Sequence, residues 1–302
     1  MQPEVIGVDL GGTAIKLGRF TQDGSCLESV TIPTPQPATP KAVIDAIASM
    51  VKQLNSQNQA IAIGVGTPGP TDAQGRIALV AINLTGWENV PLADELEAKT
   101  GLKTTIANDA NCAGLGEAWL GAGKNYHNSI LLTLGTGVGG AIIINDKLFT
   151  GHLGAAGELG LITLNPDGPP CNSGNRGSLE QYVSATAIIR ETGKNPAELA
   201  TLAEQNDPTA LMFWHNYGKQ LGAGLASLIY ILTPEVVIIG GGVSAGAKYF
   251  LSSTQKEIEK RVLPSSRINL KITVAQLGNQ AGMVGAAKLA WDKGKGKGKI
   301  KN

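Results

Sequence analysis

The chain has 302 residues, which predicts two domains of ordinary size or one large domain. Hydrophobic residues make up 42% and charged residues only 16%, so apolar material for a core is ample and a wholly disordered chain is excluded. The 40 glycines are nearly twice the usual ~7%, yet they follow no Gly-X-Y period, which excludes collagen. A net charge of +1 offers no general attraction to nucleic acid or to acidic membranes.

The three cysteines are odd in number and form no C-x-x-C pair, which argues against a disulfide scaffold and fits a reducing compartment. The N-terminal residues lack the basic region of a signal peptide. The longest largely apolar stretch, 221–232, is shorter than the ~18 residues of a spanning helix. We therefore expect a cytoplasmic protein with neither a nucleic-acid nor a membrane partner.

The first half of the chain alternates between predicted strands and helices. Buried apolar runs predict strands over 5–10, 15–20, 61–65 and 104–107. Apolar residues at helical spacing predict helices from residue 41, over 91–99 and over 110–120. Prolines between 33 and 40 predict an extended loop before the first helix.

The second half repeats this style. A predicted strand over 130–134 feeds a glycine loop and a second strand over 141–144, and helices over 179–190 and 208–232 precede a strand over 236–239. Two halves that each open with strand, glycine turn and strand predict a duplicated α/β fold with a cleft between the halves. The expected organisation is an N-terminal domain over 1–118, a C-terminal domain over 119–280, a helix over 281–292 that packs back on the first domain, and a disordered Lys/Gly tail over 293–302.

The first glycine turn follows the first strand and reads Asp9-Leu-Gly11-Gly12-Thr13-Ala-Ile-Lys16. Its glycines allow backbone N–H groups to approach an anion closely, and Thr13 and Lys16 add a hydroxyl and a cation. Asp9 could hold Mg²⁺ through water. The alternative is a plain glycine hairpin with a surface lysine.

A second glycine turn, Gly135-Thr136-Gly137, offers a similar anion site, and two such turns on opposite halves could clamp a polyphosphate. Neither turn is a Walker A loop or opens a helix as a dinucleotide-binding loop does. Gly240-Gly241-Gly242 could support an adenine or ribose, or could simply be a strand-to-helix turn. Together the three turns favour a nucleotide-dependent phosphotransferase.

These motifs resemble the ROK family of sugar kinases, within the sugar kinase–Hsp70–actin superfamily. The resemblance covers about residues 4–290. In chain order it includes Asp9 to Thr13, Gly66 to Pro70, Asn83 with Trp87, Asn108 to Asn111, Leu134 to Gly140, Gly154 to Gly160 and Gly240 to Val243. It implies two similar α/β domains of ribonuclease H-like type, with ATP and Mg²⁺ as cofactors. The nucleotide-binding residues implied are Asp9, Gly11, Gly12, Thr13, Lys16, Gly135, Thr136, Gly137, Gly241 and Gly242.

The resemblance also assigns Asp109 as the general base that accepts the proton of a sugar hydroxyl, help that is commonly worth ~10²–10⁴ in rate. The alternative is that Asn108 or Asp109 only caps the helix that begins at residue 110. The sugar-binding residues implied are Gly69, Asn83, Asn108, Asp109, Glu158 and Glu180.

The chain departs from the family at the structural zinc site, which in most members is held by one His and three Cys. Leu161 stands at the His position, Ser173 and Ser178 stand at two Cys positions, and only Cys171 remains. One thiolate cannot supply the four ligands of a structural zinc, so we expect no zinc. Because the family His also contacts the sugar, Leu161 leaves the identity of the sugar open.

The resemblance implies an ATP-dependent hexokinase of glucokinase type that acts on the 6-hydroxyl and forms a homo-oligomer, with a dimer favoured. Alternatives within the family are a fructokinase, an N-acetylhexosamine kinase and a polyphosphate-dependent glucokinase. A sugar-responsive repressor would carry an N-terminal helix-turn-helix, whereas four residues precede the first predicted strand here. A non-catalytic sugar-binding protein would not need Asp9 and Asp109 together with the phosphate turns.

Overall fold

The computed structural model describes residues 2–81 and 84–294. The chain folds into two compact units, the first formed by Met1–Lys124, Lys147–Ala156 and Asn279–Asn302, and the second by Asn125–Asp146 and Gly157–Gly278. The predicted Lys/Gly tail lies outside the described residues, except for Lys293 and Gly294, which end a helix. None of the helices in the described part of the chain is both long and apolar enough to cross a membrane.

The first unit is built on a five-stranded sheet of order β3-β2-β1-β4-β7. β1 (Glu4–Leu10), β2 (Ala14–Phe20) and β3 (Cys26–Pro33) form an antiparallel meander, and β4 (Ala60–Thr67) and β7 (Lys103–Asn108) run parallel to β1. The four strands predicted in this unit are confirmed within two residues at each end. β3 was not predicted as a strand, because six of its eight residues are exposed at the edge of the sheet and its apolar alternation is limited to Val30 and Ile32, which pack against the core.

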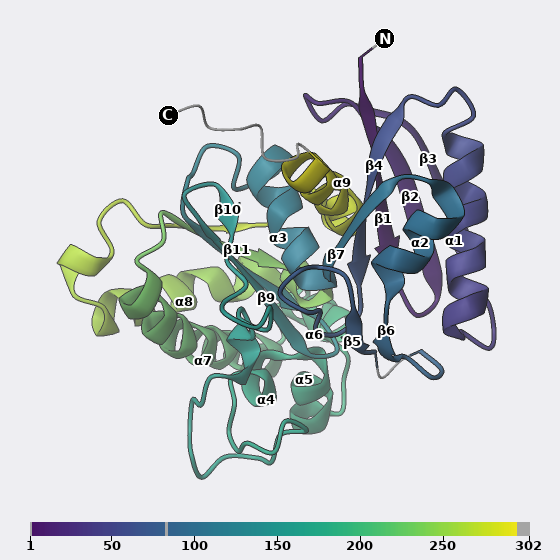
Figure 1. The fold of residues 1–302 in the computed structure, drawn as a ribbon. Helices are drawn as coiled ribbons and strands as arrows, with labels where there is room; N and C mark the ends of the chain where they lie inside the picture. The colour runs from purple at the N-terminus through teal and green to yellow at the C-terminus, as the bar shows by residue number, and fades with distance from the viewer. Residues whose placement is uncertain (1, 82–83, 295–302) are drawn as a thin grey trace. The chain divides into compact units, whose positions relative to one another are not determined.

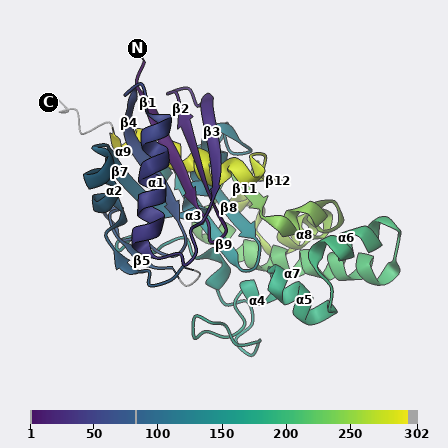
Figure 2. The same cartoon turned by 90° about the vertical axis from the view of Figure 1, so that its right-hand side faces the viewer.

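Helices cover both faces of this sheet (Figures 1 and 2). α1 (Pro40–Leu54) and α2 (Leu92–Thr100) share an apolar core with the side chains of Ile6 and Val8. Side chains alternate across a strand, so Gly7 faces the other side, where α9 (Ala281–Gly294) packs. Gly7 pairs with Gly64 of β4, and a Cβ on Gly64 would lie 2.7 Å from the carbonyl carbon of Ala286. Glycine at these two positions lets α9 lie directly on the strands, beside α3 (Asp109–Leu120).

The second five-stranded sheet has the order β10-β9-β8-β11-β12, and β8, β9, β11 and β12 belong to the second unit. Its strands are β8 (Ser129–Leu134), β9 (Val138–Ile144), β10 (Lys147–Leu148), β11 (Val236–Gly240) and β12 (Lys271–Val274). The two long helices α7 (Pro208–Leu232) and α8 (Ala247–Arg261) pack against each other and supply much of the core, including the buried rings of Trp214, Tyr217 and Phe250. Strand, glycine turn and antiparallel strand thus open both units, as the sequence predicts.

The predicted helix over 179–190 is wrong in one respect, because the chain breaks it into α4 (Glu180–Val183) and α5 (Ala185–Thr192). Ser184 has an extended backbone, and its hydroxyl accepts a hydrogen bond from the N–H of Ala187, which starts a new helix. The smaller elements are α6 (Pro196–Glu204), the 3₁₀ turns η1 (Leu159–Leu161), η2 (Gly242–Gly246), η3 (Pro264–Ser266) and η4 (Gly278–Gln280), and a two-stranded ribbon of β5 (Ala78–Val80) and β6 (Glu88–Val90).

Candidate active site

The carboxyl ends of three neighbouring strands bring candidate residues of the first unit together. Asp9 of β1 pairs in register with Gly66 of β4, and Thr67 of β4 pairs with Asn108 of β7. Because these strands are parallel, the residues that follow them emerge at the same edge of the sheet. Asp9, the loop that carries Gly69, and Asn108 with Asp109 therefore meet at one end of the unit.

Asp9 is a half-buried carboxylate with the cation of Lys16 beside it. Its Oδ2 lies 3.5 Å from the Nζ of Lys16, which also donates a hydrogen bond of 2.8 Å to the carbonyl of Asn279. Burial raises the pKa of Asp9, and Lys16 offsets part of that rise. Gly282, in the first turn of α9, lies against this carboxyl group, since a Cβ there would be 2.8 Å from Cγ of Asp9. The sequence did not single out Gly282, because its role depends on the packing of α9.

Asn108 and Asp109 divide their tasks at the start of α3. The Oδ1 of Asn108 accepts hydrogen bonds from the N–H groups of Ala110 and Asn111, at 2.9 and 3.2 Å, so Asn108 is the N-cap. Its Nδ2 donates to the carbonyl of Gly69 at 3.1 Å and so ties the loop to the helix. Asp109 is the first helical residue and is exposed, with its Oδ1 2.7 Å from the N–H of Ala110. The helix is therefore capped without relying on the Asp109 carboxylate.

The surroundings of Asp109 disfavour its charged form. Desolvation raises its pKa, the hydrogen bond from Ala110 lowers it, and the negative charge of Asp9 raises it further. The side chain nevertheless keeps solvent-accessible surface, so a ligand can reach it. This combination, an accessible carboxylate with a raised pKa, is typical of a group that accepts a proton.

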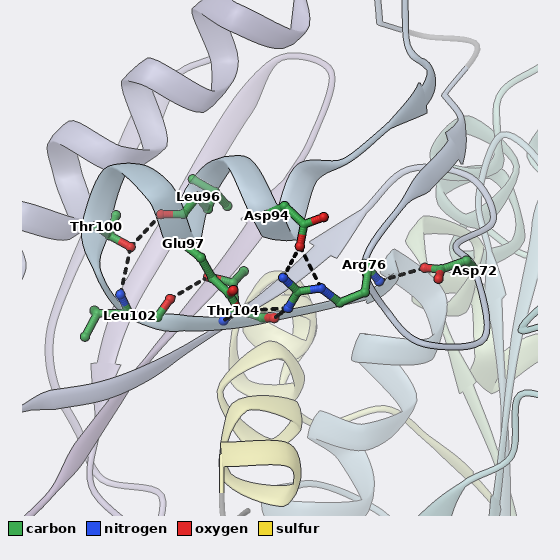
Figure 3. A network of polar contacts seen from close by, with 8 residues as sticks. All are labelled: Asp72, Arg76, Asp94, Leu96, Glu97, Thr100, Leu102 and Thr104. Atoms are coloured by element: carbon green, nitrogen blue, oxygen red, sulfur yellow. Dashed lines mark hydrogen bonds and ion pairs between the residues drawn. The ribbon is translucent and has the colours of Figure 1, made fainter.

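A polar network anchors the loop that carries Gly69 (Figure 3). Asp72 accepts hydrogen bonds from the backbone N–H groups of Arg76 and Ile77, at 2.6 and 2.7 Å, and so closes the loop on itself. The Arg76 guanidinium donates to Glu97 of α2 and to the carbonyl of Thr104 in β7, both at 2.7 Å, and pairs with Asp94. Asn83, another predicted sugar ligand, lies outside the described residues.

In the second unit the glycine turn lies between β8 and β9. Glu180, at the start of α4, accepts a hydrogen bond of 2.9 Å from the N–H of Val138 through its Oε2. A Cβ on Gly137 would lie 2.5 Å from the same oxygen, so glycine is what allows this close approach. Glu180 was predicted as a sugar ligand, and its contact with the glycine turn was not foreseen.

Three other predicted residues of the second unit are Gly241, Gly242 and Glu158. Gly241 has φ +83° and backs against the end of β8, with its would-be Cβ 2.6 Å from the N of Leu134. Gly242 has open space in front of its Cα. Glu158 is exposed at the start of η1.

The loop around Cys171 is held by neutral polar contacts. The Cys171 Sγ accepts a hydrogen bond of 3.3 Å from the Ser173 hydroxyl, and the Nδ2 of Asn175 donates to the carbonyl of Leu161 at 3.3 Å and to the hydroxyl of Thr163 at 2.9 Å. Across residues 2–81 and 84–294, no group of three or more His, Cys, Asp or Glu side chains is placed to hold a metal ion. The residues of this loop thus do not fit a structural zinc.

Two five-stranded sheets, each opening with a glycine turn between antiparallel strands, define a two-domain α/β protein of the sugar kinase and actin type, as the sequence predicts. The chain belongs to the ROK family, which it matches over residues 5–293.

Sugar kinases are among the named proteins to which the chain is similar. The chain is 36% identical to the glucokinase of Thermotoga maritima, over 95% of this chain and 96% of the relative. Its fold is similar to a ROK family glucokinase from Streptomyces griseus in complex with glucose and AMPPNP, with a TM-score of 0.78 and 35% identity over 96% of this chain and 99% of the other. It is also similar to the ROK hexokinase from Thermus thermophilus, with a TM-score of 0.85 and 32% identity over 96% and 98% of the two chains.

Proposed function

We propose that this protein transfers the γ-phosphoryl group of ATP to a hexose, and that the acceptor is the 6-hydroxyl of glucose. The likeness to glucokinases over nearly their full length supports the class of reaction. The similar Streptomyces griseus enzyme, which binds glucose and the ATP analogue AMPPNP, supports both substrates. The observation in this chain that carries the proposal is Asp109, an accessible carboxylate with a raised pKa at the start of a helix that Asn108 already caps.

Asp109 is the general base of the proposed reaction. A sugar hydroxyl attacks phosphorus poorly while it keeps its proton, so a carboxylate that accepts the proton raises the rate by ~10²–10⁴. A raised pKa makes the carboxylate a stronger proton acceptor as long as it stays ionised at the working pH. The charge of Asp9 contributes to this rise, so the two carboxylates act together.

The sugar is held by amide, carboxylate and backbone groups, whose donors and acceptors match those of a polyol. In this proposal they come from the Gly69 loop, Asn108, Glu158 and Glu180, together with Asn83. The Arg76 network and the Asn108–Gly69 hydrogen bond keep the first of these groups in place.

The nucleotide phosphates bind the backbone N–H groups of the turns at Gly11 to Thr13 and Gly135 to Gly137, and the nucleoside lies on Gly241 and Gly242. Lys16 adds positive charge beside the first turn. Asp9 fits a role in holding Mg²⁺, because a carboxylate oxygen is a ligand that Mg²⁺ prefers and one lysine balances only part of the negative charge of Asp9 and Asp109. When bound, Mg²⁺ neutralises charge on the phosphates.

The test is ADP release by the purified chain with Mg²⁺ and ATP, across glucose, mannose, fructose, N-acetylglucosamine and N-acetylmannosamine, with glucose repeated on polyphosphate. We expect turnover on glucose with ATP. The Asp109→Asn variant should still bind glucose in calorimetry and lose at least ~10²-fold in kcat.

Each other outcome has a defined meaning. Turnover on another sugar, or with polyphosphate, changes the substrate and keeps the reaction. Glucose binding without turnover on any pair points to a sugar-sensing protein. Near-normal kcat in Asp109→Asn removes Asp109 as the base. Light scattering tests the proposed homodimer, and we propose that the enzyme works in the cytoplasm.

A further inference from the structure

Each of the two glycine turns has a threonine behind it that holds its carbonyl groups. In the first unit this residue is Thr34, which directly follows β3. Its hydroxyl donates a hydrogen bond of 2.7 Å to the carbonyl of Gly11, and its own N–H donates to the carbonyl of Thr13 at 2.9 Å. Thr34 is 4% exposed, so water does not compete for these bonds.

The second unit repeats the arrangement with residues from a different element. The hydroxyl of Thr186, in α5, donates a hydrogen bond of 2.7 Å to the carbonyl of Thr136, and the N–H of Ala185 donates to the carbonyl of Gly135 at 2.7 Å. The carbonyl of Gly137 accepts from the N–H of Gly135 at 2.9 Å. All three carbonyls of the turn are therefore engaged. Unlike Thr34, Thr186 is exposed.

Holding the carbonyls fixes the direction of the N–H groups. In a trans peptide the C=O of one residue and the N–H of the next point in opposite directions. The N–H of Gly12 is thus turned away from Thr34, and those of Thr136 and Gly137 are turned away from Ala185 and Thr186. No acceptor in residues 2–81 and 84–294 takes a hydrogen bond from these three N–H groups, so they can donate to an anion.

We propose that Thr34 and Thr186 are positioning residues for phosphoryl transfer, which orient the N–H groups of the two glycine turns toward the phosphates of the nucleotide. The inference rests on the proposed kinase function and adds two residues that were not among the predicted site. Neither threonine contacts the nucleotide in this proposal. Each acts through the peptide groups that it holds.

The burial of the two threonines ranks their effects. Thr34→Val leaves the Gly11 carbonyl without its buried partner, whereas water can replace the hydroxyl in Thr186→Val. We expect KM for ATP to rise about 10-fold in Thr34→Val and about 3-fold in Thr186→Val. KM for glucose should stay unchanged in both variants, because the two turns bind the nucleotide phosphates. A general loss of folded protein would instead lower the apparent kcat without a selective rise in KM for ATP.

Matched variants separate the hydroxyl from the rest of the side chain. Thr34→Ser and Thr186→Ser keep the donor and should restore KM for ATP to within about 2-fold of the wild type. Thr192→Val is the control in α5, because its hydroxyl donates to the carbonyl of Ile188 in its own helix, at 2.8 Å, and touches neither turn. It should leave KM for ATP unchanged.

Hydrogen–deuterium exchange on the ligand-free chain tests the same idea without the reaction. Peptides spanning 9–16 in Thr34→Val, and 133–140 in Thr186→Val, should exchange faster than in the wild type, because the bonded N–H groups of Gly11, Gly135 and Val138 open more often. Unchanged exchange in both variants overturns the proposal whether or not the wild type is a kinase. If the wild type turns over no ATP, the kinase function fails, and the exchange result still decides the role of the threonines. If the wild type is active, an unchanged KM for ATP in both variants also overturns the proposed role of the threonines.

Discussion

The close contact between α3 and α9 gives the sharpest test of the packing around the proposed base. Gly285 of α9 lies against the backbone of α3. A methyl group there would be 2.5 Å from the carbonyl carbon of Cys112 and 2.8 Å from the N of Gly116, and closer still to the Cys112 carbonyl oxygen. Ordinary contacts between carbon atoms are ~3.5–4.0 Å, so Gly285→Ala would force the helices apart by at least about 1 Å.

The energetic cost follows from what the methyl group meets. Overpacking a tight site costs ~1–3 kcal/mol, and the upper end applies here because the obstructing atoms are backbone. Alanine returns ~1 kcal/mol through its better helix propensity. The net loss of about 2 kcal/mol should lower Tm by about 4–8 °C. Because α3 begins at Asp109, the same displacement should lower kcat.

Differential scanning calorimetry and ADP release measure both effects. Gly294→Ala is the matched control, because it makes the same change at the end of the same helix, where the methyl would lie 3.2 Å from the Cβ of Ala62. Its Tm should stay within about 2 °C of the wild type. Equal Tm values for Gly285→Ala and the wild type would refute the argument that backbone contact between these helices requires glycine.

Four further predictions concern charge and metal. Because the pKa of Asp109 in the ligand-free chain is raised from 3.8 and only the ionised form accepts a proton, the acid limb of kcat/KM should lie above pH 3.8; a limb at or below pH 3.8 contradicts the role of desolvation. A raised folded-state pKa also means that the stability contributed by the Asp109 carboxyl is present below about pH 4 and is lost as the pH rises. The Tm of Asp109→Asn should therefore be higher than that of the ligand-free wild type at pH 7, but not at pH 4. Arg76→Met removes the partner of Asp94 and Glu97 and the donor to the Thr104 carbonyl. Calorimetry should show that the free energy of unfolding falls by about 1–2 kcal/mol, and KM for the sugar should rise. An unchanged Tm would show that the network does not anchor the loop. Elemental analysis should find no stoichiometric zinc, and a zinc chelator should leave Tm unchanged, whereas one zinc per chain would refute the interpretation of Leu161 and Cys171.

Features that depend on neighbouring residues could be predicted from the sequence. The glycine turns, the buried strands beside them and the start of α3 at Asn108-Asp109 follow from local backbone preferences and apolar patterns, and the structure has them. The loss of three zinc ligands is likewise legible from residue identities, since ligand chemistry does not depend on the fold. Local signals failed in α8, which is rich in polar residues and was not predicted, and in β3, most of whose residues are exposed. They also failed where Ser184 interrupts a helical pattern.

The tertiary structure alone decided which distant residues meet. Gly282 lies against Asp9, Thr34 and Thr186 hold the two glycine turns, and Glu180 accepts the N–H of Val138. These pairs are separated by 23 to 273 positions, and their contacts depend on strand register and on the packing of α9 against β1 and β4. The amino-acid sequence by itself therefore determined the chemistry that each half carries. Packing determined which distant residues hydrogen-bond to the backbone of the glycine turns, because a hydrogen bond requires its two atoms to be brought within about 3 Å by the fold.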